Sequence, residues 1–318
     1  MFHYEARGIK LDGVDFWLDA HRVAPFSFVS HGHSDHLKNH SMILATPATV
    51  LFHAMRAKQK KTIALDYRRP FVFHDLTIEL FPAGHVLGSA MIRIERGGRS
   101  LLYTGDFKIK KSYTTDAIEI PQADTLIMES TFGHPLYRFD FEPEELAAQL
   151  ITFIEDCFRV DIFPIVMAYG LGKAQEAMKI LGDAGYDVRV HRDAWKIAAV
   201  YRQFGVTFEN CSVWQHEPLH GRQVLIVPPH SLQFRKVKEL PPRRRTVLLS
   251  GWAKSPAGNR FGSDCVIPLS DHADFNELLE FVRQVNPQKI YTTHGFENFP
   301  QHLRELGYDA ELLKYRLD

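Results

Sequence analysis

The spacing of apolar residues differs between the two ends of the chain. In roughly the first 130 residues, short apolar or alternating runs lie between turns, at 26–30, 76–81, 100–104 and 124–129. Alternation of apolar and polar residues, as in 76–81, is typical of a strand that buries one face in a core. This part of the chain is therefore expected to form sheets.

The period becomes helical in the middle of the chain. Apolar residues recur with helical spacing over 142–159, and Pro143 suits the first turn of such a helix. A strand at 162–167, a helix at 172–181 stopped by Gly182, and a strand at 187–190 follow it. This order predicts a small parallel sheet covered by helices.

The last section of the chain returns to the mixed pattern. A break near 241–245 precedes a strand at 246–250, and a helix at 274–285, a strand at 289–293 and a final helix follow. The chain is thus expected to be an α/β protein.

Charge removes one simple argument for a nucleic-acid-binding protein. The 318 residues include 38 Lys and Arg and 38 Asp and Glu, so the formal net charge is zero, whereas nucleic-acid binders usually present a basic surface. Basic runs such as 243–245 remain, but a solvated face is the ordinary interpretation of one such run. The 45% hydrophobic and 24% charged content is that of a soluble globular protein.

Cysteine use and the N-terminal residues indicate a cytoplasmic protein. Cys157, Cys211 and Cys265 lie far apart and form no CxxC pair, so a disulfide framework is not expected. Residues 1–13 are charged and contain no apolar signal segment, and no run approaches the roughly 18 apolar residues of a membrane helix. We therefore expect neither secretion nor membrane insertion.

Candidate chemistry begins with the stretch SHGHSDHL at 30–37. His31, His33 and Asp35 are spaced by two residues, so in an extended loop they point the same way, with His36 on the other side. Histidine nitrogen and carboxylate oxygen suit zinc and similar ions. The alternative is an exposed polar loop without a metal.

Three further residues of metal-binding type follow predicted strands. They are His85 in AGHVLG, Asp106 in YTGDF and His294 in TTHG. Each one taken alone is more simply a structural histidine or a turn aspartate. Taken together, they are the pattern by which a sandwich of sheets builds a site along one rim.

These motifs resemble those of the metallo-β-lactamase superfamily, whose fold is an αβ/βα sandwich with a two-metal site. The resemblance assigns one metal to His31, His33 and His85, and the other to Asp35, His36 and His294, with Asp106 bridging them. Asp19, in WLDA, matches an aspartate that orients the ligand loop from behind it.

Downstream motifs resemble those of the β-CASP subgroup, which are nucleases with an inserted cap domain. Glu129 begins ESTFG, His272 lies in SDHAD, and His294 lies in the third motif. The resemblance implies three segments: a first part of the metallo-β-lactamase domain at 1–133, a β-CASP cap at 134–250, and a second part at 251–318.

Phosphodiester chemistry fits this site. Two metals about 4 Å apart neutralise the phosphate and generate a hydroxide near pH 7. Family resemblance and chemistry agree on His272 as the general acid for the departing sugar oxygen, with Glu129 orienting it and favouring its protonated form. Asp35 is expected to be catalytic as well as a ligand. Ligand type does not decide between Zn²⁺, the expected ion, and Mn²⁺.

A second set of residues is expected to bind substrate. The segment YGLGK resembles the YSxGK segment of the DNA cross-link repair nucleases related to Artemis and Apollo, and its glycines and lysine could hold a phosphate at a helix start. A tight strand-to-helix turn is the alternative. Residues next to the site are expected to stack on bases and to contact phosphates. For Trp252, packing in the core is the alternative. The expected substrate contacts are Ser130, Gly172, Lys173, Trp252, Lys254 and Arg260.

The segments AYGLGKAQE and SGWA look most like those of the bacterial and archaeal ligase-associated DNA exonucleases. This resemblance implies an exonuclease that processes DNA ends in repair, in functional association with an ATP-dependent DNA ligase and a helicase. The alternative is a β-CASP ribonuclease of the RNA 3′-end processing type, because His294 occupies a position that is valine in the eukaryotic DNA-repair branch. A catalytically inactive binding subunit and a small-molecule hydrolase fit less well, because all seven ligands and the insertion are present.

Overall fold

The computed structural model describes residues 1–57, 61–233, 240–255 and 258–314. The chain divides into two compact units. The first unit consists of 1–111, 115–138 and 272–318, and the second of 112–114 and 139–271. The second unit thus continues past residue 250, where we expected the insertion to end, as far as Asp271.

One sheet of the first unit has the order β1-β2-β3-β4-β5-β6. Its first three strands pair antiparallel, and β3 to β6 pair parallel. The helix α1 (Pro47–Arg56) lies between β5 and β6 in the chain. The strands are β1 (Phe2–Glu5), β2 (Gly8–Leu11), β3 (Trp17–Leu18), β4 (Phe26–Phe28), β5 (Met42–Ala45) and β6 (Lys61–Ala64).

The second sheet of this unit has the order β19-β18-β11-β10-β9-β8-β7. Its antiparallel half runs from β7 to β10, and β10, β11, β18 and β19 pair parallel. The strands are β7 (Phe71–Phe73), β8 (Leu76–Pro82), β9 (Ala90–Arg96), β10 (Arg99–Tyr103), β11 (Thr125–Ser130), β18 (Lys289–Gly295) and β19 (Ala310–Leu312).

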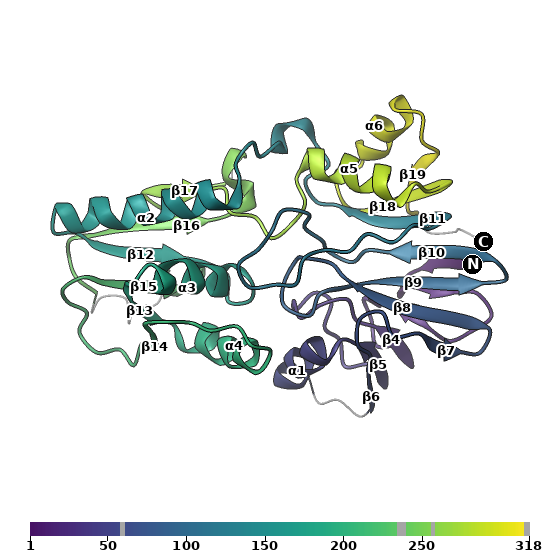
Figure 1. The fold of residues 1–318 in the computed structure, drawn as a ribbon, viewed down its shortest axis with the longest axis horizontal. Coiled ribbons are helices and arrows are strands. Elements are labelled where there is room, and N and C mark those ends of the chain that lie inside the picture. The colour runs from purple at the N-terminus through teal and green to yellow at the C-terminus, as the bar shows by residue number, and fades with distance from the viewer. Residues whose placement is uncertain (58–60, 234–239, 256–257, 315–318) are drawn as a thin grey trace. The chain divides into compact units, whose positions relative to one another are not determined.

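Both faces of this second sheet are covered. Successive side chains of a strand point to opposite faces, so neighbouring residues pack in different cores. Leu101 of β10 and Ile127 of β11 belong to the core between the two sheets. Their neighbours Leu102 and Met128 instead pack in a core with α5 (Phe275–Val285) and α6 (Phe299–Glu305). Figure 1 shows these two helices over β18 and β11. The first unit is therefore the sandwich that the sequence predicts.

The second unit contains a sheet in which every pair of strands is parallel, in the order β14-β13-β15-β12-β16-β17. This confirms the predicted small parallel sheet with helices. The helices are α2 (Pro143–Arg159), α3 (Lys173–Asp183) and α4 (Arg192–Gln203), and the strands are β12 (Phe163–Met167), β13 (Asp187–Val190), β14 (Cys211–Val213), β15 (Gln223–Val227), β16 (Arg244–Leu249) and β17 (Cys265–Ile267).

Two predictions of secondary structure were wrong. The helix α3 does not stop at Gly182 but continues to Asp183. Gly182 is required by packing, because a Cβ there would lie 2.1 Å from the carbonyl oxygen of Glu209. The helix ends before Gly185, whose φ is +86°. The chain also forms one more strand, β19, after the helix predicted as its last element.

Within the described ranges, no helix combines the length and the apolar character that crossing a bilayer requires.

A buried histidine makes the first unit sensitive to acid. His40 accepts a hydrogen bond from the N–H of Ala24 through Nδ1 (3.1 Å), and it is 1% exposed. Burial lowers the pKa of His40 to about 4. The folded protein therefore keeps this ring neutral, whereas the unfolded chain takes up a proton as the pH falls below about 6.5.

We expect His40→Gln to reduce the loss of stability between pH 6.5 and pH 4, because glutamine keeps an acceptor for Ala24 and does not titrate. The measurement is the free energy of unfolding in urea at several pH values, with a chelator present to remove metals. His74→Gln, at an exposed position, is the control and should keep the wild-type slope. An unchanged slope in His40→Gln would contradict the prediction.

Candidate metal centre

The densest group of predicted ligands lies in the loop after β4. The loop is anchored at its start by Ser30, whose N–H donates to Oδ1 of Asp19 (2.8 Å). Two glycines allow neighbouring segments to approach. A Cβ on Gly32 would lie 2.8 Å from that of Phe52, and one on Gly105 would lie 2.5 Å from that of Ser30. The glycines of the HGH and GD motifs therefore have a packing function.

The structure brings His31, His33, His85 and Asp106 together, with one donor atom of each within 4.8 Å of the others. Oδ2 of Asp106 lies 3.5 Å from Nε2 of His31 and 3.8 Å from Nε2 of His85. Nδ1 of His33 lies 3.0 Å from Nε2 of His85. These four residues come from three separate loops, after β4, β8 and β10.

His36 approaches the same carboxylate, and its ring is centred 4.1 Å from that of His31. Its Nε2 is 3.7 Å from Oδ2 of Asp106 and 3.7 Å from Oδ2 of Asp35. The ring of His294 is centred 5.9 Å from the ring of His36. Asp35, His36 and His294 are thus neighbours, but they are more loosely grouped than the first four residues. Oδ2 of Asp106 is near members of both groups.

Asp19 supports His36 from behind. Its Oδ2 accepts hydrogen bonds from Nδ1 of His36 (2.9 Å) and from the hydroxyl of Tyr103 (2.9 Å). Burial alone would lower the pKa of His36, but the charges of Asp19 and Asp106 outweigh it and raise this pKa to about 10. The bond to Asp19 also leaves Nε2 of His36 directed at the cluster. Tyr103 was missed in the sequence, because a tyrosine inside a buried strand gives no signal of a polar role.

A cation fits this set of residues. Nε2 of His31 is buried and has no hydrogen-bond partner among the described residues. Burial and the charge of Glu129 raise the pKa of Asp106 to about 7, and burial and the neighbouring histidines hold the pKa of His31 well below its usual value. A positive ion would satisfy both the nitrogen lone pair and the carboxylate. Nitrogen and oxygen donors without thiolate suit zinc or manganese.

A carboxylate–histidine pair lies next to the cluster. Nδ1 of His272 is 3.0 Å from both carboxylate oxygens of Glu129. Burial raises the pKa of Glu129, but the opposing effects of His272 and of hydrogen bonds from Thr131 and the N–H of Phe107 give a net lowering. Glu129 and His272 each place one atom within 4.8 Å of Asp106. The pair is therefore part of the same site.

The order of the strands explains why these residues meet. β8, β10, β11 and β18 run in the same direction. His85 and Asp106 follow β8 and β10, while Glu129 and His294 lie at the ends of β11 and β18. Their side chains consequently gather at one edge of the sheet. The register between β11 and β18 shifts at Glu129, and such bulges often redirect side chains at functional sites.

The predicted substrate residues have varied surroundings. Ser130 is buried, and its Oγ donates to the carbonyls of Thr293 (3.3 Å) and His294 (3.4 Å), so it connects two strands. Trp252 and Lys254 lie exposed in the short helix η4 (Gly251–Lys254).

Arg260 is also exposed, and its Nη2 donates to the hydroxyl of Tyr169 (2.8 Å). Gly172 and Lys173 both have partners inside the second unit. The N–H of Gly172 donates to Oε1 of Gln175 (2.9 Å), and Nζ of Lys173 pairs with Asp271. Asp271 was missed in the sequence, where it reads as part of a helix-capping loop.

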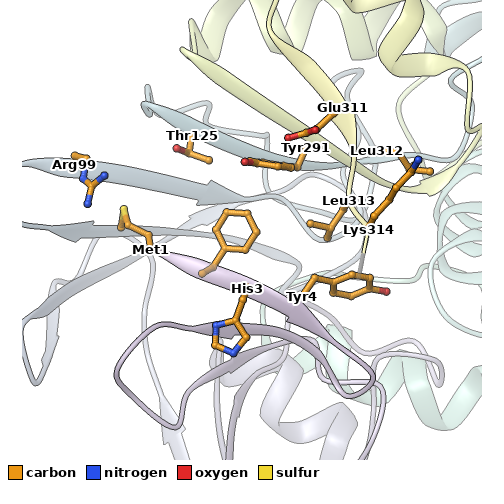
Figure 2. A pocket seen from close by; sticks show the side chains of 11 residues that line it. Met1, His3, Tyr4, Arg99, Thr125, Tyr291, Glu311, Leu312, Leu313 and Lys314 are labelled. Atoms are coloured by element: carbon orange, nitrogen blue, oxygen red, sulfur yellow. The ribbon is translucent and has the colours of Figure 1, made fainter. Parts of the chain in front are cut away.

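A cavity of about 440 Å³ in the first unit lies elsewhere (Figure 2). Its walls include Tyr4, Arg99, Thr125 and Tyr291. Thr125 begins β11, whereas Glu129 lies near the end of that strand. None of the predicted site residues is among the described residues that line this cavity.

The chain is similar in sequence and in structure to several other proteins. Residues 266–313 match the family described as Zn-dependent metallo-hydrolase RNA specificity domain. A probable DNA ligase of Opitutus terrae is 37% identical over 313 residues, which are 96% of this chain and 30% of that protein. A probable RNase MJ4 of Methanocaldococcus jannaschii is 27% identical, over 81% of this chain and 72% of that protein. The chain therefore spans less than a third of the ligase.

An RNase J-like protein of Methanocaldococcus jannaschii is 32% identical over 72% of this chain and 66% of that protein. Among solved structures, a protein of unknown function from Enterococcus faecalis V583 has a TM-score of 0.62 at 13% identity. The match covers 92% of this chain and 79% of that one. At this identity the structural likeness concerns the fold alone.

We expect Asp19→Asn to weaken metal binding by about 10–100-fold, because the residue behind a ligand fixes the tautomer and basicity of that ligand. The measurement is metal retention in competition with a chelator, followed by elemental analysis. Asp75→Asn changes an exposed carboxylate that pairs with Arg96, and it should bind metal as the wild type does. Equal affinity in Asp19→Asn and wild type would refute the supporting role of Asp19.

Proposed function

Because the chain belongs to the β-CASP subgroup of the metallo-β-lactamase family, we propose that it is a metal-dependent phosphodiesterase that acts on nucleic acid. We further propose that it is an exonuclease that processes DNA ends. The observation that carries the proposal is the pair of Glu129 and His272 next to Asp106, because it adds a proton donor to a metal centre. A metal-storage or binding site would have no use for such a donor.

Two divalent ions at this site would neutralise the phosphate oxygens and make water acidic enough to attack near pH 7. We propose that His31, His33 and His85 hold one ion and that Asp35, His36 and His294 hold the other. Asp106 is proposed to bridge the ions, because its Oδ2 lies within 3.8 Å of nitrogens from both groups.

His272 is proposed as the general acid. Its Nδ1 faces Glu129, so the proton for the departing sugar oxygen would leave from Nε2. The lowered pKa of Glu129 keeps that carboxylate charged, and a charged carboxylate favours the imidazolium form of the neighbouring ring. The side chain of His272 is 20% exposed while that of Glu129 is 1% exposed, which suits a donor reached by substrate and a partner that is not.

Asp35 is proposed to act on the attacking water as well as to bind metal. Its side chain is 77% exposed, whereas those of His36 and Asp106 are 5% and 11% exposed. Water can therefore reach the Asp35 carboxylate, and this access supports the proposal that the carboxylate accepts a hydrogen bond from the nucleophile.

An aromatic and basic surface on the second unit is proposed to bind the nucleic acid. Tyr169 and Trp252 follow the neighbouring parallel strands β12 and β16, and they are 38% and 43% exposed. Ligands commonly bind at the carboxyl ends of parallel strands. Exposed rings with cations beside them, here Lys254 and Arg260, are typical of surfaces on which bases stack. This local basic surface would allow the protein to bind a phosphate backbone although the net charge of the whole chain is zero.

The DNA assignment is supported by the match to part of a probable DNA ligase along 96% of this chain. That match also supports a functional association with an ATP-dependent DNA ligase, and the partnership with a helicase rests on the sequence resemblance. Relatives named as RNases and the RNA specificity domain favour a second candidate, a ribonuclease of the same fold. The metals are proposed to be Zn²⁺, with Mn²⁺ as the alternative, in a cytoplasmic enzyme.

Digestion of end-labelled DNA and RNA of the same sequence distinguishes the two candidates. We expect stepwise release of nucleotides from the ends of DNA, with slower cleavage of RNA, and loss of both activities after chelation. Single-stranded, duplex and circular forms are compared in parallel, because an exonuclease leaves circles intact. Robust RNA cleavage with inert DNA would overturn the DNA assignment and leave the nuclease assignment standing.

We expect His272→Ala to keep its metal content near the wild-type value and to lower turnover by about two to four orders of magnitude, which is the usual range for a general acid. Elemental analysis and single-turnover rates on labelled nucleic acid measure the two effects. His74→Ala, at an exposed position, is the control. Loss of metal in His272→Ala would place this histidine among the ligands.

A further inference from the structure

The second unit contains a buried ion pair. Nζ of Lys173 contacts Oδ1 of Asp271, and their side chains are 11% and 4% exposed. Lys173 is the first residue of α3, and Asp271 is the last residue of the second unit. The sequence had suggested that Lys173 binds a substrate phosphate, so the presence of an internal carboxylate partner changes the interpretation of this lysine.

Ion pairs of this kind contribute little net stability, because removing two charges from water offsets most of their attraction. A buried pair with good geometry instead restricts where its two residues can lie. Exposed pairs such as Lys179 with Asp183, on the same helix, impose no such restriction. The buried pair therefore indicates that Asp271 has to be held in one place.

Lys173 is itself held firmly. Its helix begins after Gly172, whose N–H donates to Oε1 of Gln175. The Nε2 of Gln175 donates to the carbonyls of Gly170 (3.0 Å) and Ala194 (3.1 Å), and this side chain is fully buried. The turn that presents Lys173 is consequently tied to the body of the second unit.

The residue after Asp271 is His272, the proposed general acid. His272 belongs to the first unit, where its ring bonds to Glu129. The next residue, Ala273, donates its N–H to the carbonyl of Phe107 (2.7 Å). His272 and Ala273 are thus both bonded within the first unit, and His272 directly follows Asp271 in the chain.

We propose that Lys173 is a positioning residue for His272, acting through Asp271, and that it does not bind a substrate phosphate. The proposal rests on the proposed function, in which His272 protonates the departing oxygen. Lys173 and Asp271 hold the N-terminal side of the peptide that carries the acid. Loss of either partner would let the ring move from the point where its proton is needed, and small displacements lower rates strongly.

The test compares Lys173→Met with the wild-type protein on two substrates. One is a labelled nucleic acid, whose sugar oxygen needs a proton to leave. The other is the 4-nitrophenyl phosphodiester of thymidine 5′-phosphate, whose leaving group needs none. On nucleic acid we expect kcat to fall about 10–100-fold with KM within about twofold, as for a lost positioning contact. On the nitrophenyl ester the rate should stay within about twofold of wild type.

A phosphate contact would give a different result. The KM for nucleic acid would rise, and the dependence of binding on salt would weaken by about one unit of slope, because one cation fewer would neutralise the backbone. That outcome would overturn the proposal. Lys179→Met is the matched control on the same helix and should behave as the wild type.

Combined variants separate this proposal from the proposed function. In a His272→Ala background, Lys173→Met should cause no further loss, because the group it positions is gone. If His272→Ala slows both substrates equally, the general-acid role fails independently of Lys173.

The double variant Lys173→Met/Asp271→Asn leaves no buried charge unpaired, so it is informative if the single variant folds poorly. It should lose no more activity on nucleic acid than Lys173→Met, and additive losses would contradict a shared role. These comparisons, made on nucleic acid alone, decide whether Lys173 positions His272, even if the nitrophenyl ester proves a poor substrate.

Discussion

One carboxylate oxygen is the point around which the first unit is organised. Oδ2 of Asp106 has nitrogens of His31, His36 and His85 within 3.8 Å, and Glu129 lies close behind it. Burying so many lone pairs and carboxylates is costly unless a positive group lies among them, either a bound cation or a protonated ring such as that of His36. The strand order, the glycines at tight approaches and the bond from His36 to Asp19 all hold this arrangement in place. The metal centre is therefore a constraint on the fold as well as its product.

Much of this arrangement could be predicted from the sequence, because its signals are local. The alternation in 76–81 predicts β8, and the spacing in SHGHSDHL predicts a shared ligand loop. The parallel sheet of the second unit follows from the order of its elements. These features depend on residues a few positions apart, and short-range periodicity is the most reliable part of a sequence.

What could not be predicted depends on contacts between distant residues. Gly182 looked like a helix terminator, but its role is to let the carbonyl of Glu209 approach the helix. The ion pair of Lys173 could not be predicted, because its partner, Asp271, is 98 positions away. Tyr103 supports Asp19 across 84 positions. In each case the contact is made with a residue that no local pattern points to.

The pairing of β11 with β18 has a consequence for how the protein is made. Ser130 bonds to Thr293, 163 positions later, so the middle of the second sheet is completed only after the whole second unit has been synthesised. Pairing across such separations is slow to form. A growing or truncated chain would hold the histidines of the early loop but neither His272 nor His294. A centre that includes His272 and His294 can therefore form only after the second unit has been synthesised.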